Sequence, residues 1–254
     1  MANFIISFKN SYVYRSNLLF GLISPFIKIF TQIALWSFLY QGNSSMITYM
    51  SGYVVLSSAI HVFYSGEIYY LISEKVSKGD YILELLRPCS FLLQKYQSAL
   101  GVDCSRFLVK AMPILLIFSP VLYRSCSLSY LPAALLAIIL AHFLFTILYA
   151  LVGCISFVFV EPWAFRRVLE DTVRILSGSI IPLALFPDWA QSIMRFLPFQ
   201  YLYDLPIRLF LGQITDQSEI IWQLFLSAAW VFTMGLLLLV VYRLAQRHCV
   251  TQGG

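Results

Sequence analysis

Two long stretches of this chain carry no charged side chain, and they constrain its fold more than any other feature. No Asp, Glu, Lys or Arg occurs from Ile29 to Gly66, and none occurs from Ser125 to Val160. Because an unpaired charge is costly in hydrocarbon, charge-free windows of this length are typical of membrane spans. The first stretch is too long for one helix of about 20 residues, and the polar run Gln41-Gly42-Asn43-Ser44-Ser45 divides it in two.

The composition excludes a water-soluble globule. Of the 254 residues, 60% are hydrophobic and only 11% are charged, and the mean hydropathy is +0.80. A soluble domain has roughly a quarter charged residues, because its surface must be covered by polar groups. The five scattered cysteines form no C-x-x-C pair and predict no disulfide framework. No basic run is longer than Arg166-Arg167, so a nucleic-acid-binding surface is not expected.

The apolar windows predict an all-α, polytopic membrane protein that forms a single domain over residues 1–254. Before the first span, Phe4, Phe8 and Tyr12 recur every four residues, which predicts an in-plane amphipathic helix over residues 1–16. Six spans are expected: about 20–40, about 48–70, the apolar run that follows Lys110 and ends at Tyr123, a long span that begins near Leu131, a short span from about Leu169 to Pro187, and 220–242.

Basic residues in the short loops set the expected orientation. They gather before span one, between spans two and three, between spans four and five (Arg166, Arg167 and Arg174), and after span six, whereas the opposite side has only Arg124, Arg195 and Arg208. The positive-inside rule therefore places both termini in the cytoplasm.

No motif predicts catalysis or a cofactor. The three histidines form no H-E-x-x-H pattern, and no nucleotide-binding G-x-x-x-x-G-K-[ST] motif occurs. We expect the histidines inside spans, His61 and His142, to be packed and hydrogen-bonded. The chain is therefore not expected to be an enzyme or to hold a cofactor or metal.

The expected cytoplasmic loop, residues 72–100, contains a short helix amid charged residues. Gly79 breaks the preceding helix, Asp80 is suited to cap a new one, and Pro88 ends it. The helix would present apolar side chains that include Leu83, Leu85 and Leu86. Two interpretations stay open: a short helix that rests on the bilayer, or a docking element for a cytoplasmic partner.

The expected outer segment, residues 187–218, is too apolar for a free loop. Trp189, Ile193, Phe196 and Leu197 share one helical face, and prolines bracket the stretch that contains Tyr201. We expect one or two short helices that re-enter the outer leaflet, with the aromatic side chains buried and Arg195 reaching the headgroups. An interfacial anchor and a gate are equally compatible with this pattern.

Lys28 is the basic residue that lies well inside the first expected span. A cation at that depth should face the protein interior or a wet cavity. If the span starts later, Lys28 instead reaches the inner headgroups by snorkelling.

These features together resemble the permease of a bacterial ABC exporter of the type-2 class. G-D-Y-I-L-E-L-L-R-P at 79–88 is similar to the family signature G-x-(5–6)-L-L-(R/K)-P. A second family region is similar to the segment whose matching pairs are Ser177-Gly178, Ile181-Pro182, Phe186-Pro187, Leu197-Pro198-Phe199, Leu205-Pro206 and Leu211-Gly212.

The resemblance implies a subunit of the bacterial inner membrane that works with a second permease, identical or paralogous. It also implies a cytoplasmic ABC ATPase dimer as partner, with ATP and Mg bound in that partner and not in this chain. The residues implied to couple the two are Gly79, Asp80, Leu83, Leu85, Leu86, Arg87 and Pro88. The candidate pathway or gate residues are Lys28, Trp189, Arg195, Phe196 and Tyr201.

The alternative is a secondary transporter or channel driven by an ion gradient. Such proteins usually have paired acidic residues inside spans, or matching broken helices in two related halves. The sequence offers only Glu67 near the inner end of the second span, and no internal repeat.

Overall fold

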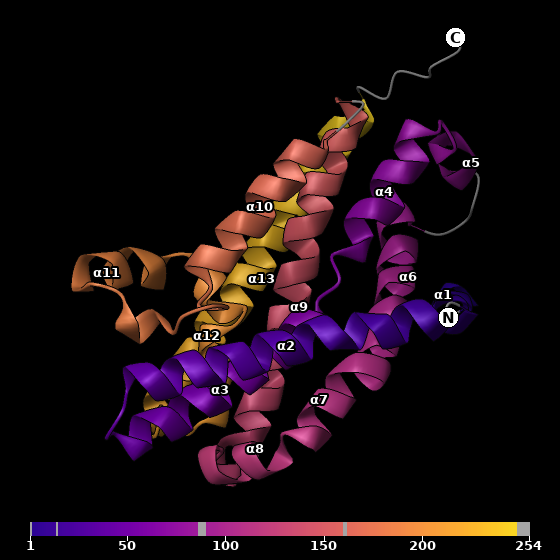
Figure 1. Ribbon diagram of the computed structural model, residues 1–254. Helices are drawn as coiled ribbons and strands as arrows, with labels where there is room; N and C mark the ends of the chain where they lie inside the picture. Colours follow the sequence, from indigo (N-terminus) through magenta and orange to yellow (C-terminus); the bar gives the residue numbers. More distant parts are fainter. Residues whose placement is uncertain (1, 14, 86–89, 160–161, 248–254) are drawn as a thin grey trace.

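The computed structural model describes residues 2–13, 15–85, 90–159 and 162–247, and every regular element in these ranges is helical (Figure 1). The α-helices are α1 (Ala2–Val13), α2 (Arg15–Leu39), α3 (Ser44–Phe63), α4 (Glu67–Ser77), α5 (Tyr81–Leu85), α6 (Phe91–Arg106), α7 (Met112–Ile117), α8 (Ser119–Ser125), α9 (Leu131–Cys154), α10 (Trp163–Leu176), α11 (Asp188–Phe196), α12 (Asp204–Phe210) and α13 (Gln217–Gln246). The shorter turns are η1 (Phe107–Ala111), η2 (Leu128–Tyr130), η3 (Ile155–Phe157), η4 (Leu183–Leu185) and η5 (Pro198–Tyr201). The all-α, multi-pass membrane fold is confirmed.

Helix α9 lies at the centre of the bundle and packs against α4, α12 and α13. Its small residues Ala134, Ala137, Ala141 and Ala150 are fully buried. Small side chains let helix backbones approach closely, which strengthens van der Waals packing. This packing matters in a membrane because the hydrophobic effect does not drive helices together there. By contrast, few residues of Gly21–Leu39 in α2 and few of α13 are buried, so these two helices form the periphery.

The second span is a broken helix. α3 ends at Phe63 and α4 begins at Glu67, and together they form a candidate span from Ser44 to Ser77. Gly66 adopts φ +65°, and a Cβ atom there would lie 2.6 Å from Cε1 of Tyr149. Two reasons therefore require glycine at position 66: its backbone is left-handed, and the tyrosine ring leaves no room for a side chain.

The third span is also irregular. The π-helical turn η1 follows α6, and Phe118 then separates α7 from α8 by a bend of 68°. Pro120 stands at the start of α8, where the missing N–H removes a hydrogen bond that a continuous helix would need. Both deviations have a local cause in the sequence, since Pro113 lies in the first turn of α7, two residues after the end of η1.

Four helices in the described ranges are long and apolar enough to cross a membrane, or five if the bent α6–α8 pair is one span. The six-span count is therefore not confirmed and stays a prediction. The expected fifth span is not a continuous helix, because α10 ends at Leu176 and the chain from Ser177 to Pro182 is not helical. α10 also carries five charged side chains, at Arg166, Arg167, Glu170, Asp171 and Arg174, which lipid would not accommodate.

Specific contacts fix α1 and the start of α13. α1 lies against α6, where a Cβ atom at Gly101 would be 2.5 Å from the carbonyl oxygen of Phe4. The in-plane position expected for residues 1–16 stays a prediction. Asp216 caps α13 by accepting from the Ser218 N–H at 3.1 Å, and the Ser218 hydroxyl lowers the pKa of the Asp216 carboxyl.

Candidate functional site

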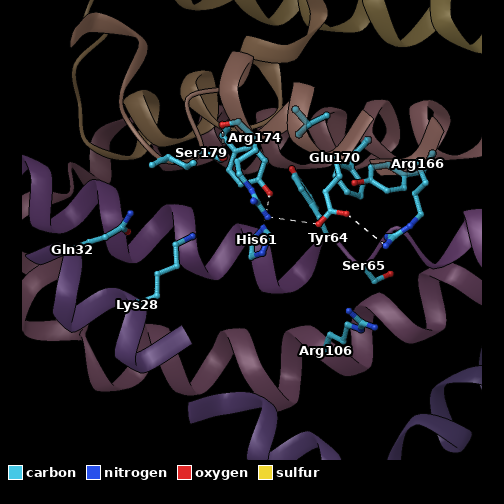
Figure 2. Close-up of a pocket in the computed structure, with 15 residues that line it drawn as sticks. Lys28, Gln32, His61, Tyr64, Ser65, Arg106, Arg166, Glu170, Arg174 and Ser179 are labelled. Atoms are coloured by element: carbon cyan, nitrogen blue, oxygen red, sulfur yellow. Dashed lines mark hydrogen bonds and ion pairs between the residues drawn. The ribbon is translucent and has the colours of Figure 1, made fainter. Parts of the chain in front are cut away.

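A cavity of about 500 Å³ lies among α2, α3, α6, α9 and α10, at the break between α3 and α4 (Figure 2). Charged and polar side chains from four of these helices line it, and aromatic rings form part of its wall. The lining residues are Lys28, Gln32, His61, Tyr64, Ser65, Arg106, Phe145, Tyr149, Arg166, Glu170, Val173, Arg174, Ser179, Ile180 and Tyr203.

The charges around the cavity are unbalanced. Four cations line it, namely Lys28, Arg106, Arg166 and Arg174, but Glu170 is the one carboxylate among the lining residues. The lining therefore offers many more hydrogen-bond donors than acceptors, and its field attracts negative charge.

Helix α10 supplies one charged wall. Arg166, Glu170 and Arg174 recur every four residues, so they share a face, and Figure 2 shows that face turned toward His61 and Tyr64. The Glu170 carboxylate lies 3.6 Å from Nη2 of Arg166 and 3.7 Å from Nη2 of Arg174. The Arg166 guanidinium also stacks over the Tyr70 ring at 4.9 Å. These two arginines therefore already have partners.

The positive charges on the opposite wall of the cavity are less well balanced by carboxylates. Lys28 on α2 has no ion-pair partner within the described residues, and Nη2 of Arg106 is 3.8 Å from the nearer carboxylate oxygen of Glu67. A second cavity of about 260 Å³ adjoins the first and shares Lys28, His61 and Arg106 with it, and Lys110 is added there. Within the described part of the chain, no acidic residue lines this second cavity.

The non-helical segment after α10 forms part of the cavity wall, and buried side chains satisfy its carbonyl oxygens. Tyr53 donates its hydroxyl to the Gly178 carbonyl at 2.6 Å, and Ser57 donates to the Ser179 carbonyl. The Asp204 N–H donates to the Ser177 carbonyl at 3.1 Å. Irregular backbone at membrane depth is stable only when its polar groups are paired in this way.

The expected coupling helix is anchored through one side. The Tyr81 ring is buried, with ring centroids 5.0 Å from Phe91 and 4.8 Å from Phe157, and its hydroxyl lies 3.0 Å from the Tyr242 hydroxyl. Gln246 donates to the same Tyr81 hydroxyl. The start of α5 is therefore fixed to α6 and to the end of α13.

An ion pair fixes the next turn of α5. Glu84 Oε1 accepts from Nζ of Lys95 at 3.0 Å, and both side chains are nearly inaccessible to solvent. On the other side of this helix, Ile82 and Leu83 are exposed, Leu83 by 63%. α5 is thus a rigid element with a free apolar face.

The other predicted coupling residues have mixed positions. Gly79 adopts φ +74°, as expected for a helix break, and the Asp80 carboxylate pairs with Lys75 at 3.0 Å. The side chain of Leu85 and the whole of Leu86, Arg87 and Pro88 lie outside the described residues. The described part of the expected two-turn helix is a single turn that ends at Leu85.

The outer segment has one buried and two exposed aromatic residues among those predicted. Tyr201 is 1% exposed, whereas Trp189 is 70% and Phe196 is 81% exposed. Trp189 and Phe196 lie on α11, which projects away from the bundle in Figure 1. Arg195 donates to the Gln191 side chain at 3.1 Å. The shared apolar face of α11 therefore points away from the protein.

The structure separates the predicted pathway residues. Lys28 lines the cavity, whereas Trp189, Arg195, Phe196 and Tyr201 are not among its lining residues. The sequence interpretation assigned Arg166 and Arg174 to loops and did not single out Arg106 or Lys110. The four-residue spacing on α10 was the available signal for the first two, but the sequence gives no sign that Arg106 and Lys110 approach Lys28.

A buried pair inside the bundle was also not predicted. Nε2 of His142 on α9 lies 3.0 Å from Oδ2 of Asp103 on α6, and both side chains are buried. The expectation that His142 would be packed and hydrogen-bonded is confirmed, with Asp103 as its partner. The same expectation is wrong for the packing of His61, which is exposed at the cavity and has the Tyr203 hydroxyl 3.4 Å from its Nδ1.

One of three comparisons with known proteins found a match. Residues 12–253 match the family model described as ABC-2 family transporter protein. A search of curated proteins and a search of solved structures found no match.

Proposed function

The chain belongs to the ABC-2 transporter family, and on that premise we propose that it forms half of the membrane pathway of an ATP-driven exporter. Its partners in this proposal are a second permease, identical or paralogous, and a cytoplasmic ATPase dimer that binds ATP and Mg. The membrane is the bacterial inner membrane, and both termini are cytoplasmic. The family match over nearly the whole chain is the observation that carries the proposal.

The way in which α5 is attached to the bundle supports coupling between the ATPase and the membrane helices through the cytoplasmic loop. A helix that transmits movement must be attached firmly on one side and free on the other. Tyr81 and Glu84 attach α5 to the bundle, while Leu83 is exposed and available to a cleft in the ATPase. Closure of the ATPase dimer would then move α5 together with α6 and α13.

The exposed periphery supports a second permease. α2 and α13 present large apolar side chains outward, among them Phe30, Phe38, Phe225 and Phe232. Lipid covers such a surface equally well, so the family assignment is what favours a partner here. The cavity lies beside α2, hence a partner against α2 would help to enclose the pathway.

The proposal is tested by changing the exposed face of the coupling helix. Leu83→Glu places a charge on the face that would dock, so we expect loss of transport and of ATPase co-purification with unchanged membrane insertion. Arg87→Glu should have the same effect, because Arg87 is proposed to meet an acidic group of the ATPase. Gly79→Val should impair coupling by disturbing the turn that precedes α5.

Tyr123→Glu is the matched control, since Tyr123 is exposed by 88% on α8 at the opposite end of the molecule (Figure 1). It should leave ATPase co-purification intact. Full transport and normal ATPase recovery by Leu83→Glu, Arg87→Glu and Gly79→Val together would contradict ATP coupling through this loop.

One observation favours a second candidate function, an ion-gradient-driven transporter. The buried Asp103–His142 pair is the kind of intramembrane ionisable pair that proton-coupled carriers use. Transport that continues without ATP but stops when the proton gradient is abolished would favour this alternative over the exporter.

A further inference from the structure

Three cations from two neighbouring spans line the smaller cavity, and two of them, Lys28 and Arg106, also line the larger one. Lys28 comes from α2, and Arg106 and Lys110 come from the third span at α6 and η1. Lys110 reaches this place because α2 has no side chain at Gly21. A Cβ atom there would lie 2.6 Å from Nζ of Lys110. Glycine at this position therefore makes room for the lysine ammonium.

These positive charges are poorly compensated by the protein itself. Lys28 and Lys110 have no ion-pair partner among the described residues, and Arg106 has one carboxylate oxygen at 3.8 Å. Like charges in a membrane-embedded site repel one another more strongly than in water, and each needs a counter-charge or hydration. Such a cluster is stable when an anion occupies the space between the cations.

We propose that the adjoining cavities bind a ligand with a phosphate-type oxyanion, carried by the substrate or by a membrane lipid, and that the oxyanion occupies the smaller cavity, which Lys28, Arg106 and Lys110 line. This inference rests on the proposed function, because it takes the cavity as part of the transport pathway. The proposal assigns Lys28, Arg106 and Lys110 as ligand-binding residues.

The number of charges favours phosphate over carboxylate. A carboxylate has one negative charge and two oxygens, and a single arginine fork satisfies it. A phosphate group has three or four oxygens and up to two negative charges, so it compensates several cations at once.

The volumes indicate that the ligand is larger than the phosphate group alone. Pockets for small organic ligands measure roughly 300–1,000 Å³, and the larger cavity measures about 500 Å³. Phe145, Tyr149 and Tyr203 provide an aromatic wall for the remainder of the ligand. An organophosphate with an apolar part fits both regions.

The experiment measures binding to the permease alone, reconstituted in nanodiscs of phosphatidylcholine. The probes are inorganic phosphate and dihexanoyl phosphatidic acid, with dihexanoyl glycerol as the neutral comparison, and calorimetry gives each dissociation constant. We expect saturable binding of at least one phosphate probe and none of the neutral probe. Binding of both phosphate probes means that the phosphate group suffices, and binding of phosphatidic acid only means that the apolar part is also recognised.

The variants show whether the phosphate lies between the three cations. Lys28→Gln and Lys110→Gln should each weaken binding by about tenfold or more, because each removes a charge-assisted hydrogen bond. Lys28→Arg should keep most of the affinity. Arg124→Gln, an equal change of charge at an exposed position on α8, should leave binding unchanged.

Probe-free thermal midpoints separate binding from folding. Lys28→Gln should be at least as stable as the wild type without a probe, because it relieves repulsion. Wild-type affinity in both glutamine variants would overturn the proposal, and so would equal binding of the neutral probe. A clear loss of stability in probe-free Lys28→Gln would also overturn it, since Lys28 would then be a structural cation.

The experiment distinguishes failure of this inference from failure of the exporter proposal. Phosphate binding without ATPase co-purification would keep the anion site and remove the exporter assignment. Co-purification of the ATPase without phosphate binding would keep the exporter assignment and remove the anion site.

Discussion

Replacing Glu84 by Gln should release the coupling helix from the bundle. Glu84 on α5 and Lys95 on α6 form an ion pair at 3.0 Å, and their side chains are only 6% and 9% exposed. The change removes the negative charge but keeps the size of the side chain. Lys95 would then be a buried cation without a charged partner, because its other close neighbour is the ring of Phe91.

Removing one member of a buried ion pair typically costs about 3–5 kcal/mol. Suppose that this free energy is lost only while α5 is packed against the bundle. The equilibrium between packed and detached α5 then shifts toward the detached state by roughly a hundredfold or more, since 1.4 kcal/mol corresponds to a factor of ten. Movement of α5 into solvent would relieve part of the cost by hydrating Lys95, so the lower end of this range is expected.

Hydrogen exchange of the amides of Tyr81–Leu85, measured in nanodiscs, tests this directly. Glu84→Gln should accelerate exchange there and leave α9 unchanged. The double variant Glu84→Gln/Lys95→Met should restore much of the protection, because it removes the unpaired charge, and a double-mutant cycle measures the coupling. Additive effects within about 0.5 kcal/mol would refute the reasoning, since the two charges would then not depend on each other.

Three further perturbations follow from the fold. Gly66→Ala should lower the thermal midpoint more than Gly42→Ala does, because both positions have positive φ but only Gly66 faces a packed ring. Equal shifts would mean that the ring contact does not matter. Tyr53→Phe should cost about 1–3 kcal/mol by leaving the buried Gly178 carbonyl without its donor, and an unchanged unfolding midpoint would argue against this hydrogen bond. A cysteine at Tyr201 should resist thiol reagents in detergent as well as in the bilayer, whereas one at Phe196 should be protected only by the bilayer. Rapid labelling at position 196 in the bilayer would place α11 in water.

The sequence alone determined the class of the protein and much of its secondary structure. The charge-free windows correspond to α2, α3 and α9, because a charge in hydrocarbon is costly whatever the tertiary contacts are. The apolar run 220–242 lies within α13 for the same reason. The family resemblance was also available from the local motifs, and the family match confirms the ABC-2 assignment.

The sequence could not determine which side of the short cytoplasmic helix faces inward. The motif drew attention to its leucines, but the structure buries Tyr81 and Glu84 and leaves Leu83 exposed. In a helix of one turn, both faces carry apolar side chains, so the pattern alone does not select between them. Contacts with Phe157 and Tyr242, distant in the sequence, select the buried face.

Only the tertiary structure decided where the cations converge. Arg166 and Arg174 had the role of loop charges in the expected topology, yet α10 folds back and turns them toward α3. Lys28, Arg106 and Lys110 line one cavity between α2 and the third span, and the absence of a side chain at Gly21 leaves room for the Lys110 ammonium. Hydrophobic periodicity specifies which residues avoid water, but it carries no information about which helix becomes the neighbour of another. The packing of the broken helices supplies that information, and with it the cavity.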